Sequence, residues 1–324
     1  MAEWLYEEGI GENRAILVED GEILEAAIEL PGELRCGSIV PGWLTDITIP
    51  GRRGFVTTAA GPVLIEPLPP GLTQGQKVRV EIAREAIAEP GNPKLAKGRI
   101  TGEAEREGPA LAERTGAAPL RQLAPDRFEE AGWSELIEEA VSGDIGFRGG
   151  HLRMSLTPAM TLLDVDGSLP PMELAVAGAA AAGRAIRRLG IGGSIGIDLP
   201  TLPPRGERQR AAAALDSTLP QPFERTAVNG FGFLQVIRRR ERPSLPELLQ
   251  WDSAGSAARA LLRRAERYPG VGRRELVAAP AVIARLRENP AWLETLARRI
   301  GAPVALREEP GFTTWAGHVH ARPS

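Results

Sequence analysis

Residues 161–170 read TLLDVDGSLP, and residues 193–200 read GSIGIDLP. In each stretch an apolar, strand-like run ends at an aspartate, Asp164 in the first and Asp198 in the second. Between them lies an Ala-rich stretch of helical periodicity, ELAVAGAAAAGRAIRRLG, so the expected order is strand, helix, strand. The two parallel strands of such a unit lie side by side or one strand apart, and their carboxyl ends open onto the same crevice. The sequence therefore predicts that the Asp164 and Asp198 carboxylates face each other.

Two close carboxylates repel each other, and the pair is stable only if a proton or a cation compensates. Mg²⁺ is held by one or two carboxylates together with waters and substrate phosphate oxygens, so this pattern suits phosphoryl chemistry. The alternative for each aspartate taken singly is a cap of the following turn or helix, and Asp166-Gly167 is itself a common turn dipeptide. The pattern alone leaves both interpretations open.

The N-terminal third of the chain has the patterning of β structure. Residues 1–30 alternate with period two on both sides of a Glu-Asp-Gly turn and predict a β-hairpin. From residue 37 to residue 99, short β-like runs are broken by Gly and Pro, which is typical of a small closed barrel such as an OB-fold. Residues 101–146 carry weak turn signals and one amphipathic helix, SELIEEAVS, and are expected to form a connector.

The remaining residues alternate between strand and helix patterns. Residues 151–236 predict a mixed α/β layer, in which Gly178 and Gly183 of the Ala-rich helix are expected to mark close packing. A stretch rich in Pro, Ser and Gly at about 243–256 indicates a boundary, and a small α/β domain is predicted after it. The predicted fold class is a multidomain α+β protein.

Composition limits the function classes. The 324 residues contain one cysteine, which excludes an internal disulfide framework and a Cys-x-x-Cys zinc site. The absence of a long apolar run and the acidic N-terminus predict a cytoplasmic protein without a membrane partner. A net charge of −3 gives no overall basic field, so nucleic-acid binding would depend on local patches.

Several motifs together resemble the ribonuclease E/G endoribonucleases over nearly the whole chain. In order along the sequence they are LYEEGIGENRAILVEDG, GSIVPGWLTDI with GFVTTAA, QGQKVRVEIAREA, SLTPAMTLLDVDGS, LGIGGSIGIDLPTL and ERTAVNGFGFLQVIRRRERPSL. The resemblance implies a remnant of an RNase H-like domain at 1–36, an OB-fold-like RNA-binding domain at 37–104, a connector with a DNase I-like catalytic domain at 105–250, and a small C-terminal domain at 251–324.

The resemblance also implies a catalytic site. Asp164 and Asp198 match metal ligands for Mg²⁺, with Mn²⁺ as the alternative, and the implied reaction is hydrolysis of single-stranded RNA that leaves a 5′-phosphate. Asp166 stands where the family usually has Asn. We count it as a third catalytic residue, whose added charge would change the surroundings of the metal.

Five residues are predicted to contact RNA because of the same resemblance. Phe55 matches a base-stacking aromatic, Lys94 and Lys97 lie in a stretch similar to a basic loop, and Arg238 and Arg240 follow the Phe-Gly strand. For the lysines and arginines, ordinary solvated surface charge is an equally good interpretation.

Two family features are missing from the sequence. The residues between the barrel and the catalytic strands are too few for the insertion that senses a 5′-monophosphate, and WDSAGS replaces the Cys-Pro-x-Cys zinc link. We therefore expect neither structural zinc nor a zinc-linked oligomer.

Three histidines complete the list of candidate groups. His318 and His320 alternate on the last predicted strand and share a face, but they have no third ligand in the sequence, so we expect no metal there. His151 follows a Gly-Gly pair and is expected to end a hairpin rather than act as a base.

The leading hypothesis is a metal-dependent endoribonuclease in RNA processing or decay, such as ribosomal RNA maturation. The first alternative is a non-catalytic or weakly catalytic RNA-binding protein on the same scaffold. The second is a deoxyribonuclease or another metallo-phosphoesterase.

Overall fold

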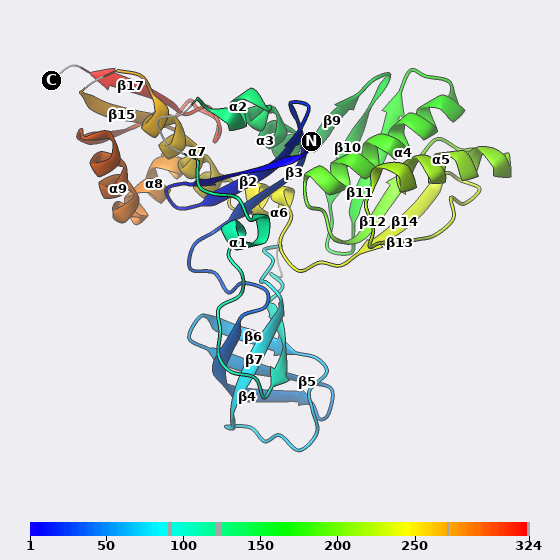
Figure 1. Ribbon diagram of the computed structural model, residues 1–324, viewed down its shortest axis with the longest axis horizontal. Coiled ribbons are helices and arrows are strands. Elements are labelled where there is room, and N and C mark those ends of the chain that lie inside the picture. Colours follow the sequence, from blue (N-terminus) through cyan, green and yellow to red (C-terminus); the bar gives the residue numbers. More distant parts are fainter. Residues whose placement is uncertain (90–92, 121–124, 271, 323–324) are drawn as a thin grey trace.

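The computed structural model describes residues 1–89, 93–120, 125–270 and 272–322 (Figure 1). The architecture is mixed α+β, with several sheets and a closed barrel, as the sequence predicts at this level. No helix within the described ranges is long and apolar enough to cross a membrane.

The N-terminal sheet has the strand order β1-β2-β3. Its strands are β1 (Glu3–Glu8), β2 (Asn13–Glu19) and β3 (Glu22–Glu29). The predicted hairpin is confirmed in β2 and β3, which turn at Asp20 and Gly21, both with positive φ. The additional strand β1 pairs antiparallel with β2, and the prediction missed it because the buried Glu7 interrupts its short apolar run.

The barrel is closed in the order β4-β5-β6-β8-β7, with β6 parallel to β8 and antiparallel pairing elsewhere. Its strands are β4 (Ile39–Ile49), β5 (Arg53–Thr58), β6 (Gly61–Ile65), β7 (Lys77–Arg84) and β8 (Ala96–Thr101). Inward-facing Leu44, Val56, Val63, Ile65 and Val80 are fully buried. This confirms the small closed barrel that the spacing of Gly and Pro predicts.

The central sheet has the order β13-β14-β12-β11-β10-β9. Its strands are β9 (Asp144–Phe147), β10 (Gly150–Leu156), β11 (Thr161–Gly167), β12 (Gly193–Asp198), β13 (Glu224–Arg225) and β14 (Phe233–Arg238). Only the β11–β12 pair is parallel among these described strands, and α4 (Pro171–Arg188) connects the two. The predicted strand, helix, strand unit is therefore confirmed.

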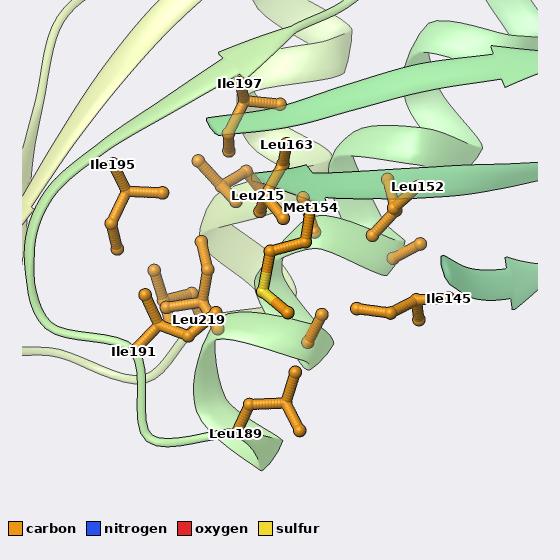
Figure 2. Close-up of a cluster of buried hydrophobic side chains, with 14 of the residues drawn as sticks. Ile145, Leu152, Met154, Leu163, Leu189, Ile191, Ile195, Ile197, Leu215 and Leu219 are labelled. Atoms are coloured by element: carbon orange, nitrogen blue, oxygen red, sulfur yellow. The ribbon is translucent and has the colours of Figure 1, made fainter. Parts of the chain in front are cut away.

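One face of the central sheet is covered by α4 and by α5 (Arg205–Thr218) (Figure 1). Alternate strand residues such as Leu163, Ile195 and Ile197 point to this side and are completely buried among apolar side chains of the helices and their loops (Figure 2). The residues between them point to the opposite face, which is mostly exposed. We call this opposite face the open face.

The two glycines of α4 lie where side chains would not fit. A Cβ on Gly178 would be 2.4 Å from Cγ1 of Val165 on β11, and one on Gly183 would be 2.2 Å from Oγ1 of Thr218 on α5. Both positions are packing glycines, as the sequence predicts, and they let α4 approach the sheet and α5 closely.

Three helices connect the barrel to the central sheet. They are α1 (Leu111–Thr115), α2 (Arg127–Glu130) and α3 (Trp133–Ser142), of which α3 is the helix predicted from SELIEEAVS.

The C-terminal part begins with α6 (Leu245–Trp251) and α7 (Ser253–Arg267). It continues with β15 (Arg273–Ala278), α8 (Pro280–Glu288), α9 (Pro290–Ile300), β16 (Val304–Glu308) and β17 (His318–Arg322), in a sheet of order β16-β15-β17. The linker indicated at about 243–256 is thus helical. Its Ser244 is the N-cap of α6 and forms a capping box with Glu247, and a proline occupies the first turn. Asp252 is the N-cap of α7, and its Oδ1 accepts from Gly255 N at 3.0 Å.

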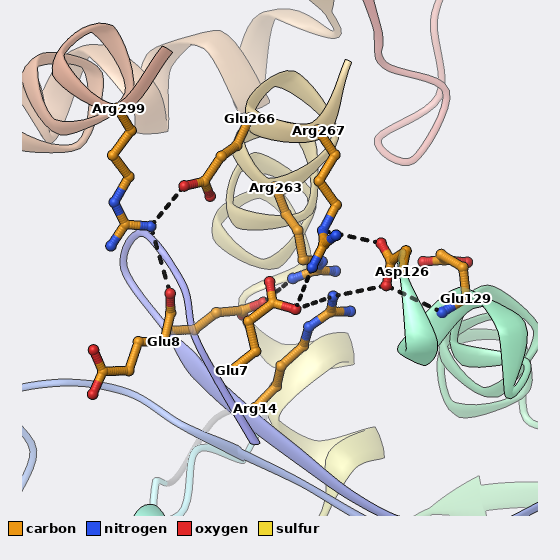
Figure 3. A network of polar contacts seen from close by, with 10 residues as sticks. Glu7, Glu8, Arg14, Asp126, Glu129, Arg263, Glu266, Arg267 and Arg299 are labelled. Atoms are coloured by element: carbon orange, nitrogen blue, oxygen red, sulfur yellow. Dashed lines mark hydrogen bonds and ion pairs between the residues drawn. The ribbon is translucent and has the colours of Figure 1, made fainter. Parts of the chain in front are cut away.

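A buried polar network ties the N-terminal sheet to the C-terminal part (Figure 3). Arg14 of β2 is 1% exposed and donates to Glu7 at 3.0 Å, and Arg267 of α7 donates to the same carboxylate at 2.9 Å. Asp126 beside α2 lies 3.7 Å from Arg14 and 3.1 Å from Arg267. Burial, reinforced by the charge of Arg263, lowers the pKa of Arg14 to about 10. Arg14 therefore stays charged at neutral pH, with carboxylates to compensate it.

The packing of α4 on α5 gives a direct test of the fold. We expect Gly183→Ala to lower the free energy of unfolding by about 1–3 kcal/mol through overpacking, although Ala favours a helix by about 1 kcal/mol. In a Thr218→Ala background, Gly183→Ala should cost much less because the closest atom is gone. Urea denaturation of the four proteins measures this, with Gly206→Ala as control because a Cβ there meets no atom within 4 Å. An equal cost in both backgrounds would contradict the assigned contact.

Candidate functional site

The two aspartates at the strand ends lie directly beside each other. Asp164 of β11 and Asp198 of β12 are register partners in the parallel pair, and both side chains are exposed on the open face. The prediction that the two strands lie side by side and bring both aspartates to the same edge of the sheet is confirmed. Neither carboxylate has a hydrogen-bond or ion-pair partner within the described part of the chain, so neither caps a turn or a helix there.

The electrostatics of this pair are unfavourable without a compensating charge. Burial, and then the neighbouring Asp164 charge, raise the pKa of the Asp198 carboxyl above its usual value. The protein thus holds two carboxylates at one point of an accessible face and leaves their repulsion unrelieved. A hard divalent cation would relieve it, because such cations bind carboxylate oxygens together with waters.

Asp166 lies on the same face, two positions beyond Asp164 on β11. Its register partner is His151, the second residue of β10, and His151 Nε2 is 3.9 Å from Asp166 Oδ2. His151 therefore lies next to the β9–β10 hairpin turn, and its side chain is on the side of the aspartates. This neighbour could not be found in the sequence, since the pairing of β10 with β11 depends on register.

A row of side chains crosses the open face through the aspartate pair. Its members are successive register partners on β9, β10, β11, β12 and β14: Asp144, Arg153, Asp164, Asp198 and Phe233. Arg153 lies directly opposite Asp164, with a side chain 62% exposed and its Nε 4.0 Å from Asp144 Oδ1. Sequence reasoning missed Arg153 because nothing but the antiparallel register brings it to the site.

A tight loop places an aromatic ring next to the end of β12. Asn229 Oδ1 accepts from the backbone N–H groups of Phe231 at 2.9 Å and of Phe233 at 3.1 Å. Between them Gly232 has a φ of 96°, and a Cβ there would be 2.1 Å from the carbonyl oxygen of Leu199, the residue after Asp198. The loop is therefore held closely against this segment while the Phe231 side chain remains 82% exposed.

The outer surface of the barrel carries a second group of candidate residues. Phe55 on β5 is a register partner of Leu64, which in turn is a partner of Lys97 on β8. Trp43 on β4 is 54% exposed and pairs with Thr57, two residues from Phe55, so its ring lies diagonal to the Phe55 ring. Lys97 forms an ion pair with Glu66 at 3.3 Å. Trp43 was not predicted, although a tryptophan at a polar-side position of an alternating strand is a usable signal.

Lys94 and Arg240 lie at the junction between the barrel and the central sheet. Lys94 pairs with Glu89 and reaches the carbonyl of Pro158 at 3.5 Å. Arg240 pairs with Glu247 and lies 3.4 Å from Glu89. Both cations are thus engaged with carboxylates of the protein.

Arg238 is held by the backbone at the end of α4. Its guanidinium donates to the carbonyl oxygens of Ile186 at 3.4 Å and of Ile191 at 3.1 Å, and burial lowers its pKa. The structure therefore brings Phe55 and Lys97 together on the barrel and places the two arginines in contacts within the fold. Their binding to RNA stays a prediction.

The described residues contain no group of three or more His, Cys, Asp or Glu side chains that could hold a metal ion. The Asp164–Asp198 pair would supply two ligands, which suits a cation that keeps several waters. His318 and His320 do share a face, as predicted, and their Nε2 atoms are 2.8 Å apart.

No protein-family model matches the chain, and no curated protein matches it. The resemblance to the ribonuclease E/G family therefore rests on the sequence motifs alone.

The aspartate pair predicts a difference in stability. We expect Asp198→Asn to raise the melting temperature of the metal-free protein at neutral pH. The folded-state pKa of Asp198 is above its usual value, so this group loses stabilising free energy as pH rises through that pKa, and Asn removes the loss. In acid, the melting temperatures of Asp198→Asn and wild type should be equal. With Mg²⁺ the wild type should melt at the higher temperature, because the cation stabilises only the intact pair.

Differential scanning fluorimetry in EDTA and in Mg²⁺ measures these melting temperatures. Asp144→Asn is the matched control, since Asp144 is an exposed aspartate in the same row but on the edge strand. Equal melting temperatures for Asp198→Asn and wild type, in EDTA at neutral pH, would rule out a repulsion between Asp164 and Asp198.

Proposed function

We propose that the protein is a metal-dependent endoribonuclease that hydrolyses single-stranded RNA to 5′-phosphate products, as a member of the ribonuclease E/G family. The observation that carries the proposal is the register pairing of Asp164 with Asp198 on the open face, without protein partners among the described residues. In this proposal the central sheet with α4 and α5 is a DNase I-like catalytic domain. The setting is RNA processing or decay in the cytoplasm, such as ribosomal RNA maturation.

Asp164 and Asp198 would hold Mg²⁺, or Mn²⁺ in its place. Bound there, the cation supplies charge neutralisation at the scissile phosphate and activation of water for attack on phosphorus. Arg153 lies opposite Asp164 with an exposed guanidinium, so it can donate to phosphate oxygens and hold the backbone at the metal. Asp166 adds negative charge on the same strand and keeps His151 at the edge of the site.

The barrel supports the RNA part of the proposal. Five strands in the order β4-β5-β6-β8-β7, with β6 parallel to β8, match the strand arrangement of an OB-fold, whose second and third strands bind oligonucleotides. Here those strands are β5 and β6. Trp43 and Phe55 offer stacking surfaces for successive bases, and Lys97 lies two strands from Phe55, across Leu64.

The second candidate is a non-catalytic RNA-binding protein. One observation favours it: the exposed Trp43 ring on the barrel does not depend on the metal site, and that site lacks a third protein ligand among the described residues. The two candidates differ in whether binding leads to a metal-dependent product.

The aspartate pair can be tested by cleavage. We expect wild-type protein to cut a fluorogenic single-stranded RNA with Mg²⁺ and not with EDTA, and Asp198→Asn to lose at least about a hundredfold in rate because the metal loses a ligand. Asp20→Asn, which changes an exposed aspartate in the β2–β3 turn, should cut at the wild-type rate. Equal rates for wild type and Asp198→Asn would refute the site, and equal cutting of a matched DNA oligomer would favour the broader phosphoesterase.

The barrel surface can be tested by binding. In the Asp198→Asn background with EDTA, Trp43→Ala should weaken binding of a short single-stranded RNA by about 1–3 kcal/mol through loss of one stacking ring. Fluorescence anisotropy measures the dissociation constant. Tyr268→Ala removes another exposed ring, on the C-terminal part, and should leave the affinity unchanged. Equal effects of the two substitutions would contradict a role for the barrel surface.

A further inference from the structure

A cavity lies at the end of the central sheet that is away from the aspartates. Its volume is about 440 Å³, within the range of small-molecule sites, which is about 300–1,000 Å³. Five segments line it: residues 88–89 beyond β7, the turn 156–161 between β10 and β11, the start of β12, Arg240 beyond β14, and the end of α6. We call it the junction cavity, because barrel and central sheet meet there.

One wall of the junction cavity is apolar and contains an indole. Trp251, the last residue of α6, is 46% exposed, and Leu156, Pro158 and Met160 lie in the same lining. The turn is closed on itself, since Thr157 Oγ1 donates to Met160 O at 2.6 Å and accepts from Met160 N at 3.1 Å. An exposed ring beside a fixed apolar wall suits a flat ligand that stacks.

The ionic groups at the cavity compensate one another. Glu89 pairs with Lys94 and Arg240, and Glu247 pairs with Arg240, so two carboxylates meet two cations. This balance gives little net field for a phosphate, and an uncharged group is the better occupant. Lys94 and Arg240 both donate to Oε1 of Glu89, and no hydrogen bond to Oε2 occurs in the part of the chain that the structure describes. That oxygen can accept a hydrogen bond from a ligand.

Further hydrogen-bonding groups line the cavity. Ser194 Oγ accepts from Gln235 Nε2 at 2.8 Å, which leaves its own hydroxyl hydrogen available to donate. Gln250 donates through Nε2 to Ala140 O at 2.9 Å, so its Oε1 is an acceptor. Donors and acceptors next to an indole are the surroundings that a nucleobase needs.

The junction cavity lies between the barrel surface and the aspartate pair. Ser194 precedes Asp198 by four residues on the same strand, which corresponds to about 13 Å. On the barrel side, Lys94 contacts Pro158 of the cavity lining and precedes Lys97 of the barrel surface by three residues. An RNA strand that runs from the barrel surface to the aspartate pair would pass the junction cavity.

We propose that the junction cavity binds one nucleobase of the RNA strand, and that it prefers a base with an exocyclic amino group. This inference rests on the proposed function. The amino group of adenine, cytosine or guanine can donate to Oε2 of Glu89, as carboxylates accept from cytosine N4 in other complexes. Uracil presents its ring N–H between two carbonyl oxygens, which would face the carboxylate unfavourably. Trp251 stacks on the base.

The test measures mononucleotide binding to metal-free Asp198→Asn protein by calorimetry. We expect AMP or CMP to bind more tightly than UMP, and inorganic phosphate not to compete. Trp251→Ala should weaken AMP binding at least about fivefold, since one stacked ring contributes about 1–3 kcal/mol, while Trp251→Phe should retain most of it. Glu89→Gln should reduce the preference for AMP and CMP over UMP. Tyr268→Ala, an exposed ring outside the cavity, should change nothing.

Equal binding by Trp251→Ala and wild type, or full competition by phosphate, would overturn the proposal. Cleavage maps separate this failure from failure of the proposed function. If Trp251→Ala protein still cuts RNA with unaltered base preference at every position, the cavity is excluded and the nuclease stands. If Trp251-dependent AMP binding occurs but Asp198→Asn cuts RNA as fast as wild type, the base site stands and the assigned catalytic site falls.

Discussion

The parallel pairing of β11 with β12 is the constraint on which the candidate site depends. It fixes Asp164 and Asp198 as register partners, so their carboxylates share one point of the open face whatever the surrounding loops do. The helix that connects the two strands, α4, packs closely on β11, and Gly178 permits this because a Cβ there would clash with Val165. The Ala-rich helix α4 thus packs on one face of the two strands, while the two aspartates lie on the opposite face.

Charged side chains are paired in the interior of the protein but not at the aspartate pair. Arg14 is almost completely buried, and it is compensated by Glu7 and Asp126, because an unpaired buried charge would cost several kcal/mol. The aspartate pair has no such compensation among the described residues, and burial together with the Asp164 charge raises the pKa of Asp198. Arg153 lies opposite Asp164 but forms its ion pair with Asp144, so under the proposed function a bound cation, and not this arginine, would relieve the repulsion.

The sequence was sufficient where the decisive pattern is local. Alternation in 13–29, the Gly and Pro spacing of the barrel, and the strand, helix, strand unit around α4 each lie within a few tens of residues, and each is confirmed. It was insufficient where the answer depends on register or on caps. Arg153 reaches the site only through antiparallel pairing, and Ser244 and Asp252 look like linker residues although they begin helices. Composition cannot distinguish a cap from a loop, because the same side chains satisfy the backbone in both.

The distribution of paired and unpaired groups bears on how RNA would be held under the proposed function. Most nucleic-acid binding proteins draw much of their affinity from cations that neutralise phosphates. Here the net charge is −3, and Lys94, Lys97 and Arg240 are engaged with carboxylates of the protein. The rings of Trp43 and Trp251, in contrast, are about half exposed. Under the proposed function, stacking on bases would then supply the larger share of the affinity. The Asp164–Asp198 pair, which has no ion-pair partner among the described residues, would hold the metal at the phosphate that is cut.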